Sequence, residues 1–305
     1  MYDSLTMFVT SNQPEKVLKA LGSPREDTNR LTGEIVLRGR IQNLRVKIIS
    51  NRVVIIGSLA KYYFGNNLET LTREDTRCAI ERLSDTMQLD VAQANVYSLE
   101  VASNFSMQQP VQIYCQCLGE CRYFEKSQFK HALLYSNSNR SLIFYDKIKE
   151  LKRHKERVPS RFDEANLLRY ELKLKKRLSK QLSKKEVLAR ELYEESFYRA
   201  ILEKWQSEYF RIGRVNRLKI ERIEMNSMNS PKKLEKILAS LGLQAIGEQA
   251  ILNYIEENKH SLSKLQRSRL KARIRQLSQN KSVTEPQEAI LELDSKVKQT
   301  VARQH

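Results

Sequence analysis

The segment from Ser141 to Glu150, Ser-Leu-Ile-Phe-Tyr-Asp-Lys-Ile-Lys-Glu, brings together side chains that could carry out covalent chemistry. If the segment is a strand, Tyr145 and Lys147 share one face, because side chains two residues apart point the same way. A phenol with a pKa of about 10 is a poor nucleophile at neutral pH unless a cation or a metal ion stabilises the phenolate. Tyr145 beside Lys147 therefore indicates a tyrosine nucleophile, with Tyr170 as the next candidate. The alternative is a tyrosine partly buried at a strand end, a common place for this residue.

Two glutamates lie on otherwise polar faces of predicted strands. Glu100 alternates with small side chains, and Glu171 lies between Arg169 and Lys173. Carboxylates that face one another from separate strands are the ligands that Mg²⁺ or Mn²⁺ takes in proteins. We therefore expect Glu100 and Glu171 to hold a divalent metal ion. For either residue alone, the alternative is an exposed strand glutamate.

Several common catalytic motifs are missing. With 9 glycines, the chain contains no Gly-rich phosphate loop, and it has no His-x-His, His-Glu-x-x-His or Gly-x-Ser-x-Gly motif. We therefore expect neither an ATP-binding P-loop nor a dinucleotide-binding fold. Cys115, Cys117 and Cys121 lack the usual zinc-ligand spacing, which favours buried reduced thiols over a metal site.

Hydrophobic periodicity predicts strands in the first part of the chain and helices in the second. A helix is expected over 73–87, with Thr72 as its N-cap and Asp75 three residues further on. Strands are expected within 33–56, 96–105, 122–124, 132–145 and 166–177, with a short helix near 111–117. Helices are expected over 191–211, 231–241, 247–258 and 262–277. The predicted fold class is α+β, an antiparallel-rich sheet with flanking helices followed by a helical, basic C-terminal region.

The charge of the chain is unevenly distributed. Its net charge is +18, of which residues 1–146 contribute +2, residues 147–222 contribute +11 and residues 223–305 contribute +5. The strongly basic block at 147–222 attracts polyanions, so nucleic acid is the leading partner. The alternative is a basic surface that only contacts solvent. No apolar stretch approaches the ~18 residues of a membrane span, and the N-terminus lacks a secretory pattern. We therefore expect a cytoplasmic protein without a membrane partner.

The segment 141–150 also resembles the nucleophile segment of phage and plasmid replication proteins of the filamentous-phage gene II/X type, which belong to the rolling-circle initiators. In that family a tyrosine is followed by lysine two residues later and by glutamate five residues later. Tyr145, Lys147 and Glu150 stand at these positions.

Two further stretches are similar to strands of the same family. The strand Tyr97-Ser-Leu-Glu100 occupies the place of the family's Ser-Arg-Ile-Asp strand, but it has Ser98 where arginine is expected and Glu100 where aspartate is expected. The longer carboxylate keeps the charge of a metal ligand. The family's later strand places an arginine, an aromatic residue and a glutamate before a basic run, and the matching residues are Arg169, Tyr170 and Glu171.

The resemblance, over roughly residues 30–185, implies a divergent relative of the HUH nucleases that holds its metal ion with acidic residues rather than paired histidines. In such an enzyme Tyr145 attacks the scissile phosphate and Lys147 stabilises the developing charge. The products are a 5′-phosphotyrosine, which allows rejoining without ATP, and a 3′-OH that primes rolling-circle synthesis. The implied ligands of Mg²⁺ or Mn²⁺ are Glu100, Glu171 and Glu150.

These inferences predict a tyrosine nickase that acts at a DNA origin. Its expected partners are the origin DNA and the host helicase and polymerase. A relaxase for conjugative transfer and a non-catalytic, basic nucleic-acid-binding protein are the alternatives. We expect a catalytic sheet domain at 1–182, a helical basic DNA-binding region at 183–281 and a frayed or disordered tail at 282–305. The expected DNA contacts are Arg169, Lys173, Lys175, Lys176, Arg177, Arg267, Arg269, Lys271, Arg273 and Arg275.

Overall fold

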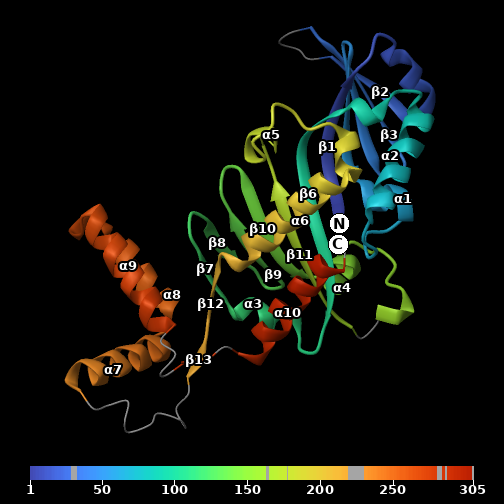
Figure 1. Ribbon diagram of the computed structural model, residues 1–305. Coiled ribbons are helices and arrows are strands. Elements are labelled where there is room, and N and C mark those ends of the chain that lie inside the picture. The colour runs from blue at the N-terminus through green and yellow to red at the C-terminus, as the bar shows by residue number, and fades with distance from the viewer. Residues whose placement is uncertain are drawn as a thin grey trace. The chain divides into compact units, whose positions relative to one another are not determined.

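The structure, a computed structural model, forms two compact units (Figure 1). The sheet unit comprises Met1–Cys115, Cys121–Arg211 and Lys296–His305, and the helical unit comprises Gln116–Glu120 and Ile212–Ser295. The α+β fold class is confirmed. The structure describes residues 1–28, 33–162, 165–176, 178–218, 230–279, 284–285 and 287–303.

A ten-stranded sheet forms the centre of the sheet unit. Its strand order is β2-β3-β4-β5-β1-β6-β11-β10-β9-β8, and neighbouring strands are antiparallel. The first strand of the chain, β1, therefore lies between β5 and β6, near the middle of the sheet. The strands are β1 (Tyr2–Thr10), β2 (Gly22–Thr28), β3 (Ile35–Ile41), β4 (Leu44–Ile49), β5 (Arg52–Ser58), β6 (Asn95–Met107), β8 (Glu125–Gln128), β9 (Ala132–Ser136), β10 (Arg140–Asp146) and β11 (Asn166–Leu174).

Helices flank this sheet. Helix α2 begins as predicted, since Thr72 accepts a hydrogen bond from the Asp75 backbone and Asp75 accepts one from the Thr72 backbone. Its Ile80 and Leu83 are buried. The helices of this part are α1 (Leu59–Phe64), α2 (Arg73–Met87), α3 (Val111–Gln116), α4 (Lys147–Arg153), α5 (Leu178–Gln181) and α6 (Glu195–Phe210), with 3-10 turns η1 (Pro14–Ala20), η2 (Val91–Gln93), η3 (Ser160–Phe162) and η4 (Ala189–Tyr193). Helix α10 (Glu288–Ala302) has residues in both units, with its residues up to Ser295 in the helical unit and those from Lys296 in the sheet unit.

Helix α6 crosses one face of β6, β11 and β10 (Figure 1). Its fully buried Trp205 lies 4.8 Å from the ring of Tyr170, and Tyr170 stacks on Phe144 at 4.6 Å. The Tyr170 hydroxyl donates to the carbonyl of Trp205 at 3.0 Å. Because this aromatic cluster is part of the sheet's core, α6 belongs to the sheet unit. The compact sheet unit thus continues past residue 182, to Arg211.

The structure corrects other expectations. The tail expected to be frayed or disordered contains helix α10, which buries Ile290, Leu293 and Val297. Strands β1 and β2 were not predicted, and 122–124 lies between strands β7 and β8 rather than in one. Tyr97 of β6 is 47% exposed.

Helices α7 (Pro231–Ile246), α8 (Glu248–Glu257) and α9 (Lys264–Ser278) dominate the helical unit, as the periodicity predicted. Their core consists of Leu243, Leu252, Ile255 and Ile274. Among the described residues, no helix is long and apolar enough to cross a membrane. The remaining elements of this unit are β7 (Leu118–Cys121), β12 (Ile212–Arg214), β13 (Arg217–Leu218), β14 (Thr284–Glu285) and η7 (Lys259–Ser261).

Candidate active site

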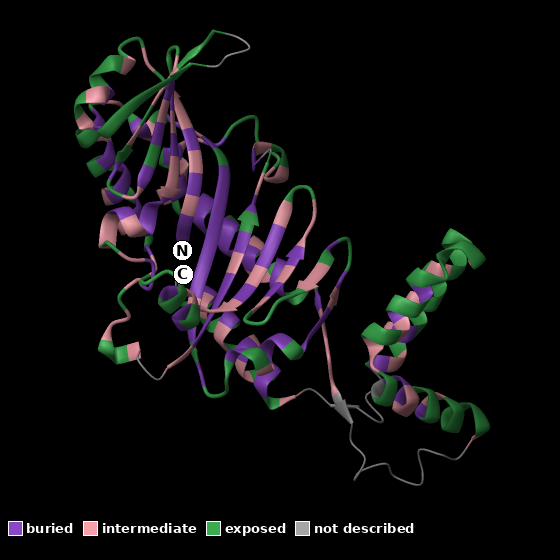
Figure 2. Cartoon of the chain, turned by 180° about the vertical axis from the view of Figure 1, so that it is seen from behind, coloured by how far each residue is buried: buried purple, intermediate pink, exposed green. Residues whose placement is uncertain are grey.

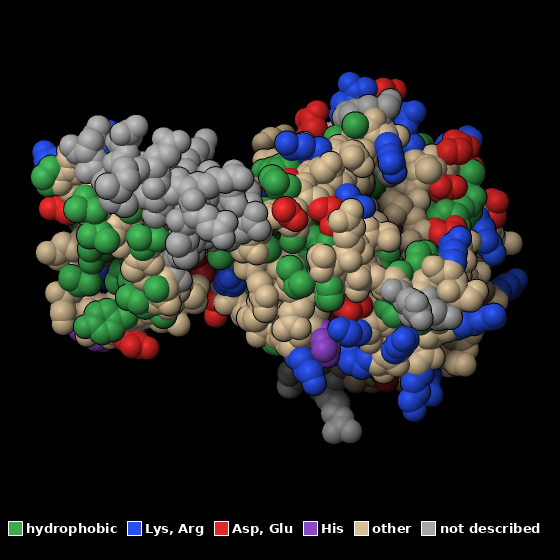
Figure 3. Space-filling model, turned by 90° about the horizontal axis from the view of Figure 1, so that it is seen from below, with side chains coloured by type: hydrophobic (Ala, Val, Ile, Leu, Met, Phe, Trp, Pro, Cys, Tyr) green, Lys and Arg blue, Asp and Glu red, His purple; other side chains and the backbone are tan. Residues whose placement is uncertain are grey.

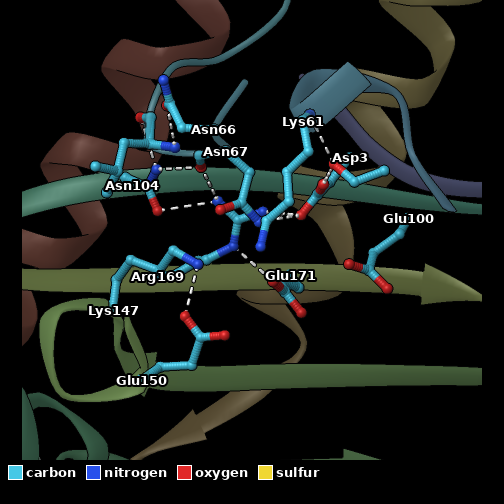
Figure 4. A network of polar contacts seen from close by, with 12 residues as sticks. Asp3, Lys61, Asn66, Asn67, Glu100, Asn104, Lys147, Glu150, Arg169 and Glu171 are labelled. Carbon is cyan, nitrogen blue, oxygen red and sulfur yellow. Dashed lines mark hydrogen bonds and ion pairs between the residues drawn. The ribbon is translucent and has the colours of Figure 1, made fainter. Parts of the chain in front are cut away.

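Three carboxylates from neighbouring strands converge in the middle of the sheet. Asp3 comes from β1, Glu100 from β6 and Glu171 from β11, and each offers an oxygen within 4.8 Å of the others (Figure 4). Asp3 and Glu100 are buried, and Glu171 is half-buried. The structure thus brings Glu100 and Glu171 together and adds Asp3, which the sequence did not indicate. Hard oxygen donors in this arrangement fit a divalent cation such as Mg²⁺ or Mn²⁺.

Arg169 binds two of these carboxylates. Its guanidinium forms ion pairs with Asp3 and, at 2.5 Å, with Glu171. It also donates to the carbonyl of Asn67 at 2.9 Å and to the side chain of Asn104 at 3.1 Å. The residue is 2% exposed, so the structure lends no support to the expected DNA contact at Arg169. The alternation of β11 was correct, but on its charged face Arg169 and Glu171 belong to a polar network, whereas Lys173 is exposed.

Tyr145 lies beside the acidic group. Its hydroxyl donates to Oε1 of Glu171 at 2.7 Å, the oxygen that also accepts from Arg169. In the register of β10 and β11, Tyr145 stands directly opposite Arg169. Burial raises the pKa of Tyr145, and the neighbouring carboxylates raise it further, while Arg169 acts in the opposite direction. The phenol is therefore neutral and is hydrogen-bonded to a base.

Lys147 and Glu150 do not occupy their expected places. Strand β10 ends at Asp146, whose side chain caps α4, so Lys147 is the first residue of a helix rather than the next position on the strand face. Its fully buried ammonium donates to Glu150 at 2.6 Å. Among the described residues, no hydrogen bond joins Lys147 to Tyr145, and Glu150 is outside the acidic group. Lys147 is therefore paired with Glu150 rather than with the phenol, and the expected roles of Lys147 at the phenol and of Glu150 as a metal ligand stay predictions.

The acidic group carries more negative charge than its neighbours offset. Burial and then the repulsion of Glu171 and Asp3 raise the pKa of Glu100 to about 8, although Lys173 lies 3.4 Å away. Burial acts on Asp3 in the same direction, but Arg169 and hydrogen bonds from Ser58 and Asn67 hold its pKa below the usual value. Glu100 therefore binds a proton more readily than an ordinary glutamate, because too little positive charge lies near it. This supports the fit of a metal ion.

A cleft of about 610 Å³ opens next to this group. Tyr145 and Glu171 are part of its wall, together with cations that no sequence pattern singled out. Viewed from below, Lys and Arg side chains gather around a histidine on the sheet unit (Figure 3). Cations in the wall of the cleft can hold the phosphates of a nucleic acid next to the phenol. The basic residues that line the cleft are Lys130, His131, Lys149 and Arg153.

The other expected DNA contacts lie near the end of β11 and on α9. Lys173 and Lys176 are exposed at the end of β11, Lys175 is half-buried, and Arg177 lies outside the described residues. The remainder lie on α9, where Lys271 forms an ion pair with Glu256. The expected contacts on α9, all exposed or half-buried, are Arg267, Arg269, Lys271, Arg273 and Arg275.

Asp3 is the main residue that sequence reasoning missed. The signal was present, since Leu5, Met7 and Val9 alternate with Thr6 and Phe8 as in a strand. Asp3 is the only acidic residue of that stretch, and it enters the core with β1. An acidic residue in a buried strand is a signal for a polar site, because an unpaired buried charge is costly.

Residues 1–194 match the family model that describes the N-terminal part of the gene II-type replication-associated protein of phages. No curated protein sequence matches the chain. Because the family match covers more than half of the 305 residues, the chain belongs to this family of phage replication-associated proteins. The resemblance to gene II-type initiators is confirmed, and with it a role in the initiation of DNA replication. The match spans the sheet with its acidic group and Tyr145.

Proposed function

We propose that the sheet unit cuts one DNA strand at a replication origin by transesterification, with Tyr145 as the nucleophile. The observation that carries this proposal is the 2.7 Å hydrogen bond from the Tyr145 hydroxyl to Glu171, at the edge of a convergent acidic group and in the wall of an open cleft. A nucleophile, a base and a place for the phosphate are thus within reach of one another.

In the proposed reaction, Glu171 accepts the phenolic proton as the Tyr145 oxygen attacks the phosphorus. The oxygen–phosphorus bond of the phosphotyrosine forms while the bond from phosphorus to the 3′ oxygen breaks, and the 3′ oxygen takes a proton. Arg169, opposite Tyr145 on the neighbouring strand, stabilises the negative charge that develops during the attack, a role that the sequence had suggested for Lys147. The cut leaves a 5′-phosphotyrosine and a 3′-OH that can prime synthesis. The reverse reaction rejoins the strand.

Asp3, Glu100 and Glu171 would hold the metal ion. A divalent cation there would supply positive charge that polarises the phosphate and favours the phenolate. Lys130, Lys149 and Arg153 in the cleft would fix the flanking phosphates.

Covalent capture tests this proposal. The full chain is incubated with Mn²⁺ and supercoiled DNA of the genetic element that encodes it, and nicked circles and protein–DNA adducts are resolved on denaturing gels. Tyr145→Phe should abolish both products while leaving DNA binding in place. The matched control is Tyr97→Phe, a half-exposed tyrosine of the same sheet, which should behave as the unmodified chain. An adduct that persists in Tyr145→Phe would overturn the assignment.

A further inference from the structure

A group of basic side chains lies on the first strands of the sheet. Five cations gather there on β3, β4 and the start of β5. We call this surface the basic strand face; it consists of Arg38, Arg40, Arg45, Lys47 and Arg52.

The strand register places the basic strand face on the same side of the sheet as the acidic group. Arg45 stands opposite Ile56, Ile56 opposite Thr6, and Thr6 opposite Ser98, and residues directly opposite one another point to the same face. Ser98 lies two residues from Glu100, so it shares that face too. With strands about 4.8 Å apart, β3 lies roughly 19 Å from β6 across the sheet.

Like charges oppose one another on this surface. Arg40 pairs directly with Arg45, Arg38 with Lys47, and Arg25 of β2 with Arg38. Opposed like charges destabilise a sheet, because the side chains are only about 5 Å apart at their β-carbons. Three such pairs in a row indicate that an anion from outside the chain compensates for this cost.

The chain itself offers few counter-charges. Among the residues that the structure describes, Arg40, Arg45 and Lys47 form no ion pair, and Arg38 pairs only with the exposed Asp27 at 2.7 Å. The guanidinium of Arg52 lies over the Phe8 ring at 4.4 Å. These cations are therefore available to a ligand.

The surface is also partly apolar and uncovered. Val54 and Ile56 are half-buried between the cations, whereas Val53 and Ile55 on the other face are fully buried. Viewed from behind, the strands lie in front of the helices that cover their opposite face (Figure 2). Aliphatic side chains and the Phe8 ring offer contacts to unpaired bases, and the cations offer contacts to phosphates.

We propose that the basic strand face binds single-stranded DNA that continues from the cut site, and that it holds this strand across β1, β5, β4 and β3. The proposal rests on the proposed function, since it assigns the path of that substrate. It adds a binding surface in a part of the sequence whose net charge of +2 gave no indication of one.

The test compares two triple variants of the full chain, each combined with Tyr145→Phe so that cutting does not interfere. One carries Arg40→Gln, Arg45→Gln and Lys47→Gln. The control carries Lys16→Gln, Lys19→Gln and Lys185→Gln, three exposed lysines outside β2–β5. Fluorescence anisotropy measures binding of a labelled 30-nucleotide single strand and of the same sequence as a duplex, over a range of salt concentrations. Thermal melting verifies that both variants are folded.

The strand-face variant should bind the single strand about tenfold more weakly than the control, with a log–log salt slope lower by about 2. Equal single-strand affinity in the two variants would overturn the proposal, and so would a loss restricted to the duplex. Covalent capture with the unmodified Tyr145 is scored separately. If the chain with Tyr145 forms no adduct but the strand-face variant binds the single strand more weakly, the binding surface is supported and the proposed nuclease activity is rejected. If the adduct forms but the strand-face variant binds as the control does, only the binding surface is rejected.

Discussion

The two faces of β11 show how one alternating strand can perform two tasks. On the face beneath α6, Leu168, Tyr170 and Leu172 are fully buried among apolar and aromatic side chains. On the other face, Arg169 is equally inaccessible, but its surroundings are carboxylates and amides. Burial therefore does not distinguish core from site in this strand. The partners of the buried groups do.

The largest expected effect comes from removing the cation of the polar face. Arg169→Met should lower the free energy of unfolding by about 3–5 kcal/mol, because it leaves the charges of Asp3 and Glu171 buried without their partner. Addition of Mn²⁺ should recover part of this loss by neutralising the same carboxylates. Urea unfolding with and without Mn²⁺ measures both effects.

The control for that variant is Arg161→Met, which removes an exposed ion pair with Glu69 and should change stability by less than about 0.5 kcal/mol. Equal stability of the Arg169 and Arg161 variants would mean that the polar face does not depend on its guanidinium.

The next effect is a pH dependence confined to the polar face. Glu100 has a pKa of about 8 in the folded chain, above the ordinary value of 4.5, so the folded state keeps a proton that the unfolded chain loses. Without added metal, the contribution of Glu100 to stability should therefore be fully present below about pH 4.5 and should be lost as the pH rises from about 5 to 8, by up to about 1.4 kcal/mol per pH unit. The lowered pKa of Asp3 acts in the opposite direction at acid pH, where protonation of its carboxylate destabilises the folded state.

Glu100→Gln should flatten this fall, because the amide does not titrate. Thermal melting at a series of pH values compares it with Glu69→Gln, an exposed glutamate that should leave the profile unchanged. Identical profiles in the two variants would assign the pH dependence to another group.

The smallest effect concerns the tyrosine of the apolar face. Tyr170→Phe removes one buried hydrogen bond to Trp205 and should cost about 1 kcal/mol, while the nicking expected of Tyr145 persists. Tyr145→Phe also removes one hydrogen bond, the one to Glu171, but should abolish nicking. Melting temperatures and adduct yields measure the two effects. Loss of the adduct in Tyr170→Phe would contradict the assignment of stability to the apolar face and of nicking to the polar face.

The sequence predicted local structure where the chemistry of a short segment decides it. The N-cap at Thr72 and the alternation of β11 depend on neighbours in the chain, and both are confirmed. The position of Lys147 depended on where β10 ends, and the cap by Asp146 turns the chain into a helix one residue earlier than alternation assumed. A capping residue next to a strand end was thus a signal that could have been used.

Pairing between distant segments decided the rest. Asp3 reaches Glu100 and Glu171 only because β1 enters the sheet between β5 and β6, and no local pattern specifies this partner choice. The basic strand face could not be predicted for a related reason. Arg40 and Arg45 become opposed only through the register of β3 and β4, whereas a charge count over 146 residues averages them with distant acids.

The central place of β1 has a consequence for folding. This strand joins β2–β5 to β6 and the later strands, and its residues pair far along the chain, Ser4 with Ser58 and Tyr2 with Val101. Contacts so distant in sequence form slowly, so we expect the two halves of the sheet to meet late, on a time scale of about milliseconds to seconds. Asp3 arrives with the strand that joins them. An intermediate in which only one half has formed therefore lacks the complete acidic group, and the nuclease that we propose would become active only in the fully assembled sheet.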